Sequence, residues 1–174
     1  MKQSLNLKTV LIALSMALAL PTAWSQGEPA SGVVSGMNEG VIHDAARMGT
    51  RNDVERLLKA SAQNRDVRTP LGASPLHYAA MNGDSGPLKA LLAAGANPNG
   101  RDGDGRTPLH MAAFSTRKDN AMLLLQAGSD PLLKTNDGRD VLSMARKVRA
   151  DEIAGEISLW ILKGCKPGTS VKGC

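Results

Sequence analysis

Apolar residues recur along the middle of this chain with the spacing of α-helices. Residues 107–126 contain two apolar stripes, separated by a polar segment at 115–120. Their members are Leu109, Ala112, Ala113, Ala121, Leu124 and Leu125. The alanines would let a neighbouring helix approach closely, and Gly128 is the expected left-handed stop after the second stripe. The pattern predicts a pair of short helices.

The same pattern returns at a spacing of 33 residues. GASPLHYAAMNG at residues 72–83 is matched by GRTPLHMAAFST at residues 105–116. VIHDAARMG at residues 41–49 precedes them by 34, and GRDVLSMAR at residues 138–146 follows by 33. The chain therefore holds about four copies of one helical pair.

Each inner copy opens with a helix-start signal. Thr107 is the predicted N-cap, with its hydroxyl placed to accept the backbone N–H of His110. Pro108 then occupies the first helical position, where its missing N–H costs nothing. Between copies, residues 97–105 and 130–138 are rich in turn formers, so we expect them to project as loops.

The motif T-P-L-H-x-A-A, followed by a second apolar run and L-L-x-x-G-A, resembles the ankyrin repeat. The resemblance covers about residues 38–162. It implies an all-α solenoid of about four helix-turn-helix repeats with projecting loops. The outer copies depart from the motif as terminal caps do, because neither end has a further repeat to stack on.

Residues 1–25 have the features of a secretory signal peptide. Two lysines precede an eleven-residue apolar stretch at 10–20, and residues 23–25 form a small-x-small cleavage site. A helix that spans a bilayer needs ~20 residues, so we expect cleavage and no membrane insertion. Residues 26–37 would then be a flexible leader. The expected location is the bacterial periplasm, with secretion as second choice.

Charge and composition narrow the partner classes. The net charge of +5 falls to +3 on cleavage, because two lysines and no acids are removed. Basic and acidic residues are interspersed and aromatics make up 2% of the chain, so no basic stripe for nucleic acid is present. The 149 residues after the signal peptide suffice for one domain with a continuous core. We expect a monomer.

Candidate chemistry is sparse. His43, His77 and His110 occupy one repeat position, which in ankyrin-like proteins makes structural hydrogen bonds. One histidine per stacked repeat spaces the rings ~8–10 Å apart, too far for one metal ion. The DGDG segment at residues 102–105 indicates a turn rather than a calcium loop. No nucleophile elbow or phosphate-binding loop occurs, so we predict no catalytic residue, metal or cofactor.

Two cysteines lie in the tail at residues 163–174. Cys165 and Cys174 are separated by eight residues, with a turn-forming Lys-Pro-Gly between them. In an oxidising compartment an isolated even pair indicates a disulfide. A redox-active pair is the alternative, although C-x-x-C is absent.

The ankyrin resemblance implies a protein partner bound by the concave helix face and the loop tips. Counting repeat register, we take the residues after each A-A pair and before each cap as the candidate interface. They are Arg47, Met48, Met81, Asn82, Arg106, Phe114, Ser115, Arg139 and Lys147. Phe114, the only phenylalanine, should face outward; the alternative is that it folds over a neighbouring loop. An apolar centre with basic surroundings suits a partner with an acidic rim.

Two non-enzymatic functions follow from this reading. The first is an interaction module, and resemblance to small exported bacterial ankyrin proteins suggests a role accessory to a periplasmic enzyme or stress response. The second is an immunity or inhibitor protein that neutralises a periplasmic toxin or enzyme. The inhibitor predicts one very tight partner, whereas the accessory module predicts moderate affinity.

Overall fold

The structure is a computed structural model that describes residues 40–166. In this part of the chain, eight α-helices follow one another as four pairs. The pairs are α1 (Val41–Met48) with α2 (Arg51–Ala60), α3 (Pro75–Met81) with α4 (Gly86–Ala93), α5 (Pro108–Phe114) with α6 (Lys118–Gln126), and α7 (Val141–Lys147) with α8 (Asp151–Leu162). A short 3-10 helix, η1 (Ala62–Arg65), follows α2. The prediction of an all-α solenoid with about four helical repeats is confirmed.

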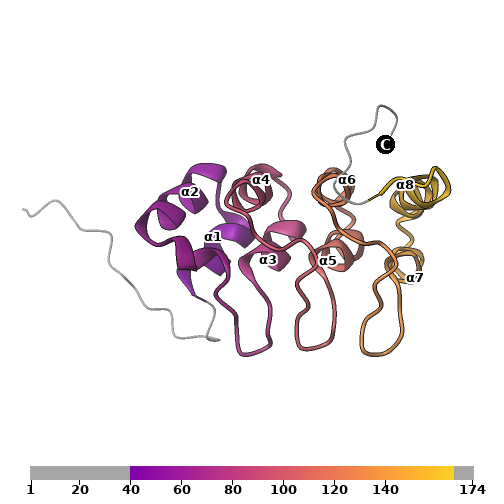
Figure 1. Cartoon of the computed structure of the whole chain (residues 1–174), viewed down its shortest axis with the longest axis horizontal. Coiled ribbons are helices and arrows are strands. Elements are labelled where there is room, and N and C mark those ends of the chain that lie inside the picture. Colours follow the sequence, from indigo (N-terminus) through magenta and orange to yellow (C-terminus); the bar gives the residue numbers. More distant parts are fainter. Residues whose placement is uncertain (1–39, 167–174) are drawn as a thin grey trace, which may run out of the picture. The chain divides into compact units, whose positions relative to one another are not determined.

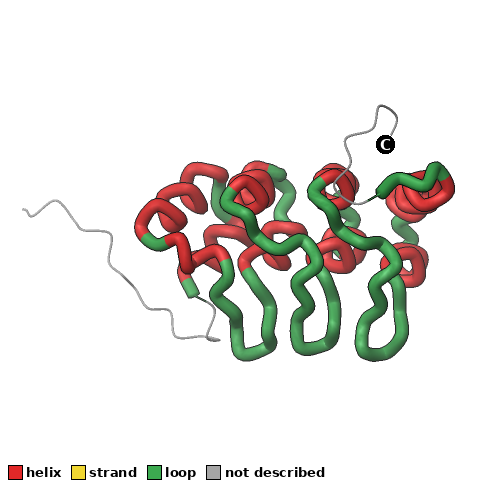
Figure 2. The backbone as a smooth tube through the Cα atoms, in the orientation of Figure 1, coloured by secondary structure: helices red, strands yellow, loops and turns green. Residues whose placement is uncertain are grey.

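The helices of the repeat region form two rows (Figure 1). The inner row consists of α1, α3, α5 and α7, each in contact with the next. The outer row contains α2 and α4 in contact, and α6 and α8 in contact. Figure 2 shows the long loops between repeats projecting on the side of the inner row. The inner helices and the loops therefore share one face, which we call the concave face.

The second and third repeats each start with a small polar residue that bonds the histidine of the motif. Thr107 precedes α5, and its backbone N–H donates to Nδ1 of His110 at 3.2 Å. The hydroxyl of Thr107 lies 2.8 Å from the same nitrogen. Ser74 and His77 repeat these contacts at 3.1 and 2.8 Å. Helices α3 and α5 therefore begin where the sequence predicted. In each, the imidazole also bonds the residue that precedes the helix.

The inner row is held together by small residues. Ala79, Ala80, Ala112 and Ala113 are fully buried where α3 packs against α5. Leucines fill the space between the two rows, and they include Leu76, Leu88, Leu91, Leu109, Leu124 and Leu125. Because the alanine side chain ends at Cβ, neighbouring inner helices pack closely without aromatic residues, as the sequence predicted.

Three loops lie between the repeats: loop 1 (residues 66–74), loop 2 (residues 97–107) and loop 3 (residues 130–140). Loops 2 and 3 contain the predicted turn segments. Loop 1 turns at Gly72 and loop 2 at Gly105, where φ is +76° and +75°. These values lie in the left-handed region that glycine adopts without strain, so glycine is the residue suited to each turn.

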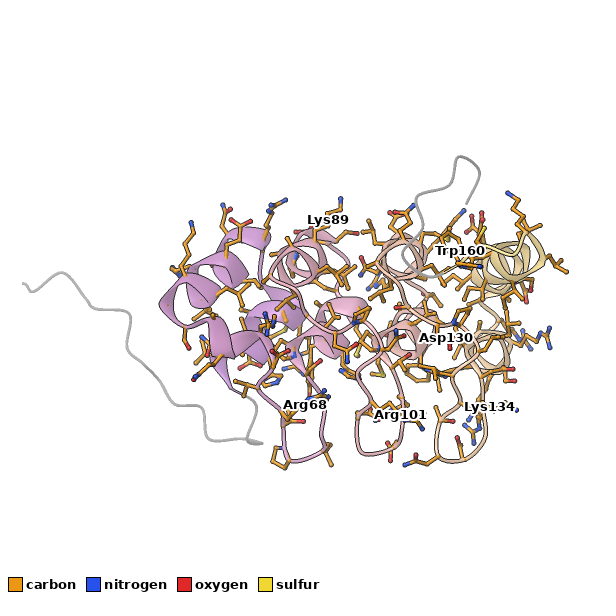
Figure 3. All side chains as sticks on the ribbon, viewed as in Figure 1. Arg68, Lys89, Arg101, Asp130, Lys134 and Trp160 are labelled. Atoms are coloured by element: carbon orange, nitrogen blue, oxygen red, sulfur yellow. The ribbon has the colours of Figure 1, made fainter. Side chains whose placement is uncertain are left out.

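Neighbouring loops are joined by hydrogen bonds. The backbone N–H of Gly103 in loop 2 donates to the carbonyl of Leu71 in loop 1 at 2.7 Å. The N–H of Asn136 in loop 3 donates to the carbonyl of Asp104 at 2.9 Å. The loops also carry a row of basic residues: Arg68, Arg101 and Lys134 (Figure 3). The two backbone hydrogen bonds between the loops fix their spacing, so side chains on adjacent loops have defined relative positions.

Some predictions concern residues outside the described part. The predicted signal peptide (1–25), leader (26–37) and Cys174 lie there. Cleavage and the Cys165–Cys174 disulfide therefore stay predictions. Between residues 40 and 166, no helix combines the length and apolar character needed to cross a membrane.

Candidate protein-interaction surface

The concave face is hollowed between the third and fourth repeats. A groove of about 360 Å³ lies between α5 and α7 and is bordered by loops 2 and 3. Its lining residues are Asp104, Arg106, Met111, Phe114, Thr135, Asn136, Asp137, Arg139, Met144 and Lys147. We call it the α5–α7 groove. It brings together four residues of the predicted interface: Arg106, Phe114, Arg139 and Lys147.

The floor of the groove is apolar. Phe114 is 52% exposed, a large fraction for a phenylalanine on a helix that otherwise contributes to the core. Met111 lies one helical turn before it and is half-buried, and Met144 of α7 is buried. Methionine is unbranched and polarizable, so a surface that contains it can adjust to the shape of an apolar side chain. The floor therefore offers an adaptable contact for such a side chain.

Arg106 is held rigidly at the loop end of the groove. Its Nε donates to Oδ2 of Asp102 at 2.8 Å, and its Nη2 lies 2.8 Å from Oδ2 of Asp104. The side chain of Asp102 is 3% exposed and also accepts the backbone N–H groups of Asp104 and Arg106. Two carboxylates thus compensate the guanidinium of Arg106, and a second guanidinium lies nearby, since Nη2 of Arg101 donates to Oδ1 of Asn136 at 3.3 Å.

Loop 3 contributes a further ion pair. Arg139 Nη2 lies 2.9 Å from Oδ2 of Asp137. The hydroxyl of Thr135 donates to the carboxylate of Asp137, and this bond together with the Arg139 charge lowers the pKa of Asp137. Asp137 therefore stays ionised at neutral pH, and the charge of Arg139 is compensated.

Lys147 differs from both arginines. It is the last residue of α7 and is exposed at the helix end of the groove. Within residues 40–166 it forms no ion pair, whereas each arginine of the groove has at least one carboxylate partner. Lys147 is thus the uncompensated charge of the groove.

The predicted interface residues of the first two repeats lie apart from the groove. Arg47 is paired with Asp44 at 3.3 Å and lies over the ring of Tyr78, 6.0 Å from its centroid. Met48 is 73% exposed, and Met81 is half-buried. None of these residues lines the α5–α7 groove. The structure therefore splits the predicted interface into two groups.

Asn82 and Ser115 occupy one repeat position, and both are less exposed than a contact residue was expected to be. Asn82 is buried, and its amide donates to the carbonyls of Ala46 and Gly49, both at 3.1 Å. Its inclusion in the interface is corrected on this ground, because the side chain joins two repeats and is covered. Ser115 is half-buried and does not line the groove.

Register counting missed six lining residues: two methionines of the floor, two acids, and Thr135 and Asn136 of loop 3. Met111 and Met144 each lie three residues before a residue that was predicted, Phe114 and Lys147 respectively. The i, i+3 relation puts them on the same helical face, so this signal was available in the sequence. The two acids, Asp104 and Asp137, face the groove only because the loop fold directs them there.

The histidines serve structure. Nδ1 of His77 accepts hydrogen bonds from Ser74, so the ring proton resides on Nε2, which donates to the carbonyl of Arg106 at 3.0 Å. Burial lowers the pKa of His77 to about 4, and burial also lowers the pKa of His110. Both rings are therefore neutral at pH 7. The expectation of structural hydrogen bonds at the helix start and to the next repeat is met by His77.

Metal chemistry finds little support in the described region. Among its residues, no cluster of three or more His, Cys, Asp or Glu side chains is arranged to hold an ion. The absence of catalytic residues and cofactors stays a prediction.

Comparison with known proteins identifies the family. The sequence model described as ankyrin repeats, three copies, matches residues 42–135. This match covers more than half of the chain, so the chain belongs to the ankyrin-repeat family. Ankyrin repeats generally mediate protein–protein interaction and are typically not enzymes. No curated protein matches the chain.

Proposed function

We propose that this chain is a non-enzymatic module that binds a protein partner through the α5–α7 groove and the tips of loops 2 and 3. The observation that carries the proposal is the exposure of Phe114, which lines a groove together with two methionines and two ion-paired arginines. Interfaces combine such an apolar centre with a polar rim. An aromatic side chain on a rigid helix loses little conformational entropy when it is covered.

We place this function in the periplasm, after removal of residues 1–25. The proposal is supported by the lysine-flanked apolar stretch and the small-x-small site. A role accessory to a periplasmic enzyme or stress response fits a moderate affinity. The immunity or inhibitor function would instead show a very tight complex with one enzyme or toxin.

The test compares a groove variant with a matched control. The protein, Phe114→Glu and Leu159→Glu are immobilised and exposed to a periplasmic extract of the native cells. Leu159 lies on α8, outside the groove, and its exposure of 51% matches that of Phe114. We expect a protein that is retained by the unmodified chain and by Leu159→Glu, and is lost with Phe114→Glu.

Circular dichroism spectra of the three proteins must agree, because loss of binding through unfolding is uninformative. Equal retention by all three would place the binding surface elsewhere and overturn the groove. Retention by none, repeated with cross-linking to trap weak complexes, would overturn the interaction module itself.

A further inference from the structure

The α5–α7 groove has a fixed order of chemistry along its length. Loops 2 and 3 precede their inner helices, so the acids at the loop tips come first and the helix ends come last. Along the groove the order is Asp104 and Asp137, then Arg106 and Arg139, then Met111 and Met144, then Phe114 and Lys147. Each repeat supplies one member of each pair, so the order follows from the shared backbone.

Charge differs between the two ends of this order. At the loop end, Asp102, Asp104 and Asp137 are balanced by Arg106, Arg139 and Arg101, whose Nη2 donates to Oδ1 of the lining residue Asn136 at 3.3 Å. At the helix end, Lys147 has no carboxylate partner among the described residues. The groove thus has a charge-balanced loop end and a helix end where apolar side chains lie beside an uncompensated cation.

The neighbouring residues strengthen the positive end. Arg146 precedes Lys147 and is also exposed, and Arg149 follows in the turn after α7. The two carboxylates of α8 that pair with a lysine, Glu152 and Glu156, are engaged by Lys118 of α6. The sequence of α7, VLSMARK, contains no acid; the acids that flank it are its N-cap Asp140 and Asp151, the first residue of α8, and neither forms an ion pair with Lys147 in the described region.

We infer that the partner presents a segment in which an apolar side chain lies within about one helical turn of a carboxylate, with the apolar side chain on the Met111–Phe114–Met144 floor and the carboxylate against Lys147. This inference rests on the proposed function and adds the chemistry of the bound segment. A carboxylate gains most at Lys147, because the arginines that line the groove already have acidic partners.

The test uses peptide display, which needs no knowledge of the natural partner. A library of random twelve-residue peptides is selected against the purified protein, and binders are kept only if Phe114→Glu weakens them. We expect the kept peptides to share an apolar anchor and an Asp or Glu within four positions of it. Selection against Lys147→Glu should enrich Lys or Arg at that position instead.

Affinities of one selected peptide provide the quantitative readout. We expect binding to weaken about tenfold with Lys147→Glu and to stay within about twofold with Lys89→Glu. Lys89 is an exposed lysine of α4 in the outer row and is the matched control (Figure 3). Among the selected peptides, we expect the acid near the apolar anchor only in those selected against the unmodified protein.

The outcomes separate the two proposals. Groove peptides without an acidic preference, or with the same preference in Lys147→Glu, would overturn the inference and leave the proposed function standing. If no peptide is weakened by Phe114→Glu, the groove is not a peptide-binding surface, and the proposed function falls together with the inference.

Discussion

The two halves of the inner row use equivalent positions differently. In α5 and α7, Phe114 and Lys147 face a groove. The ring of Phe114 is exposed there, and Lys147 has no carboxylate partner in the described region. In α1, Arg47 occupies the corresponding position, but Asp44 and Tyr78 already bind its guanidinium. At this position the first repeat satisfies its own cation, whereas the third and fourth repeats leave Phe114 and Lys147 available to another molecule.

The loops show the same contrast. Loop 1 carries Leu71 and Ala73 where loop 2 carries Asp104 and Arg106. Loop 2 can form a charged rim because Arg106 is oriented by two carboxylates, whereas loop 1 has neither the cation nor the acids at these positions. The comparison shows that repeat register marks positions available for binding, and that neighbouring side chains decide which of them are used.

Acidification should destabilise the fold through the buried histidines of both halves. The folded-state pKa of His77 is about 4, below the ordinary 6.5, so the unfolded chain takes up the proton first as pH falls. Stability is fully present above pH 6.5 and is lost between pH 6.5 and 4, by about 3 kcal/mol. Urea unfolding at several pH values measures this slope, and His77→Gln should flatten it.

His110→Gln should flatten the slope as well, because burial lowers its pKa too. Carboxylates with lowered pKa values, such as Asp140, contribute stability that is lost only below pH 3.8. Their effect therefore falls in a lower pH range than that of the histidines. An unchanged slope in both histidine variants would show that the pH dependence has another origin.

Partner binding should depend on the C-terminal half alone. Phe114→Glu places a charge on the apolar floor and should weaken binding about 100-fold, the size of a hot-spot loss. Met48→Glu changes a side chain that is more exposed, on α1, and should weaken binding less than about threefold. Titration calorimetry with the captured partner gives both values. Equal losses would join the two halves into one interface.

An alanine substitution at the position shared by Asn82 and Ser115 should lower stability in the second repeat and leave it nearly unchanged in the third. Asn82→Ala removes the amide that donates to the carbonyls of Ala46 and Gly49, and should lower the free energy of unfolding by about 2 kcal/mol. Ser115→Ala at the same position should change it by less than about 0.5 kcal/mol. Urea denaturation measures both, and a neutral Asn82→Ala would restore Asn82 to the candidate interface.

The turns between paired helices give the smallest expected effect. Thr116 and Arg149 have φ near +56°, in the left-handed region that β-branched threonine adopts with strain. Gly49 and Gly83 occupy the same repeat position outside that region. Thr116→Gly should therefore raise the free energy of unfolding by about 1 kcal/mol.

Gly83→Ala is the companion variant for this turn. A Cβ at Gly83 would meet its nearest atoms, those of the Arg117 side chain, at 3.8 Å, so alanine fits. It should be neutral or stabilise by about 0.5 kcal/mol, because it restricts the unfolded chain. Thermal melts of both variants measure the effects, and a destabilised Thr116→Gly would argue against strain at this turn.

The repeat, the helix starts and the buried alanines could be predicted from the sequence, because they depend on local spacing and on residue types that act within one or two helical turns. The sequence also located Phe114, Arg106, Arg139 and Lys147 on the contact side. It did not show that Asn82 is covered, since its partners lie 33 and 36 residues earlier in the chain. Nor did it show which cations are already paired.

Tertiary structure decided the groove itself. Met111 and Met144 form one floor only because α5 packs beside α7, and Asp104 and Asp137 reach the rim only because hydrogen bonds hold the loops in register. Both effects join residues about one repeat apart, and packing distance at that range depends on the whole stack rather than on any local pattern. The residues free to bind are those that the neighbouring repeats leave unpaired.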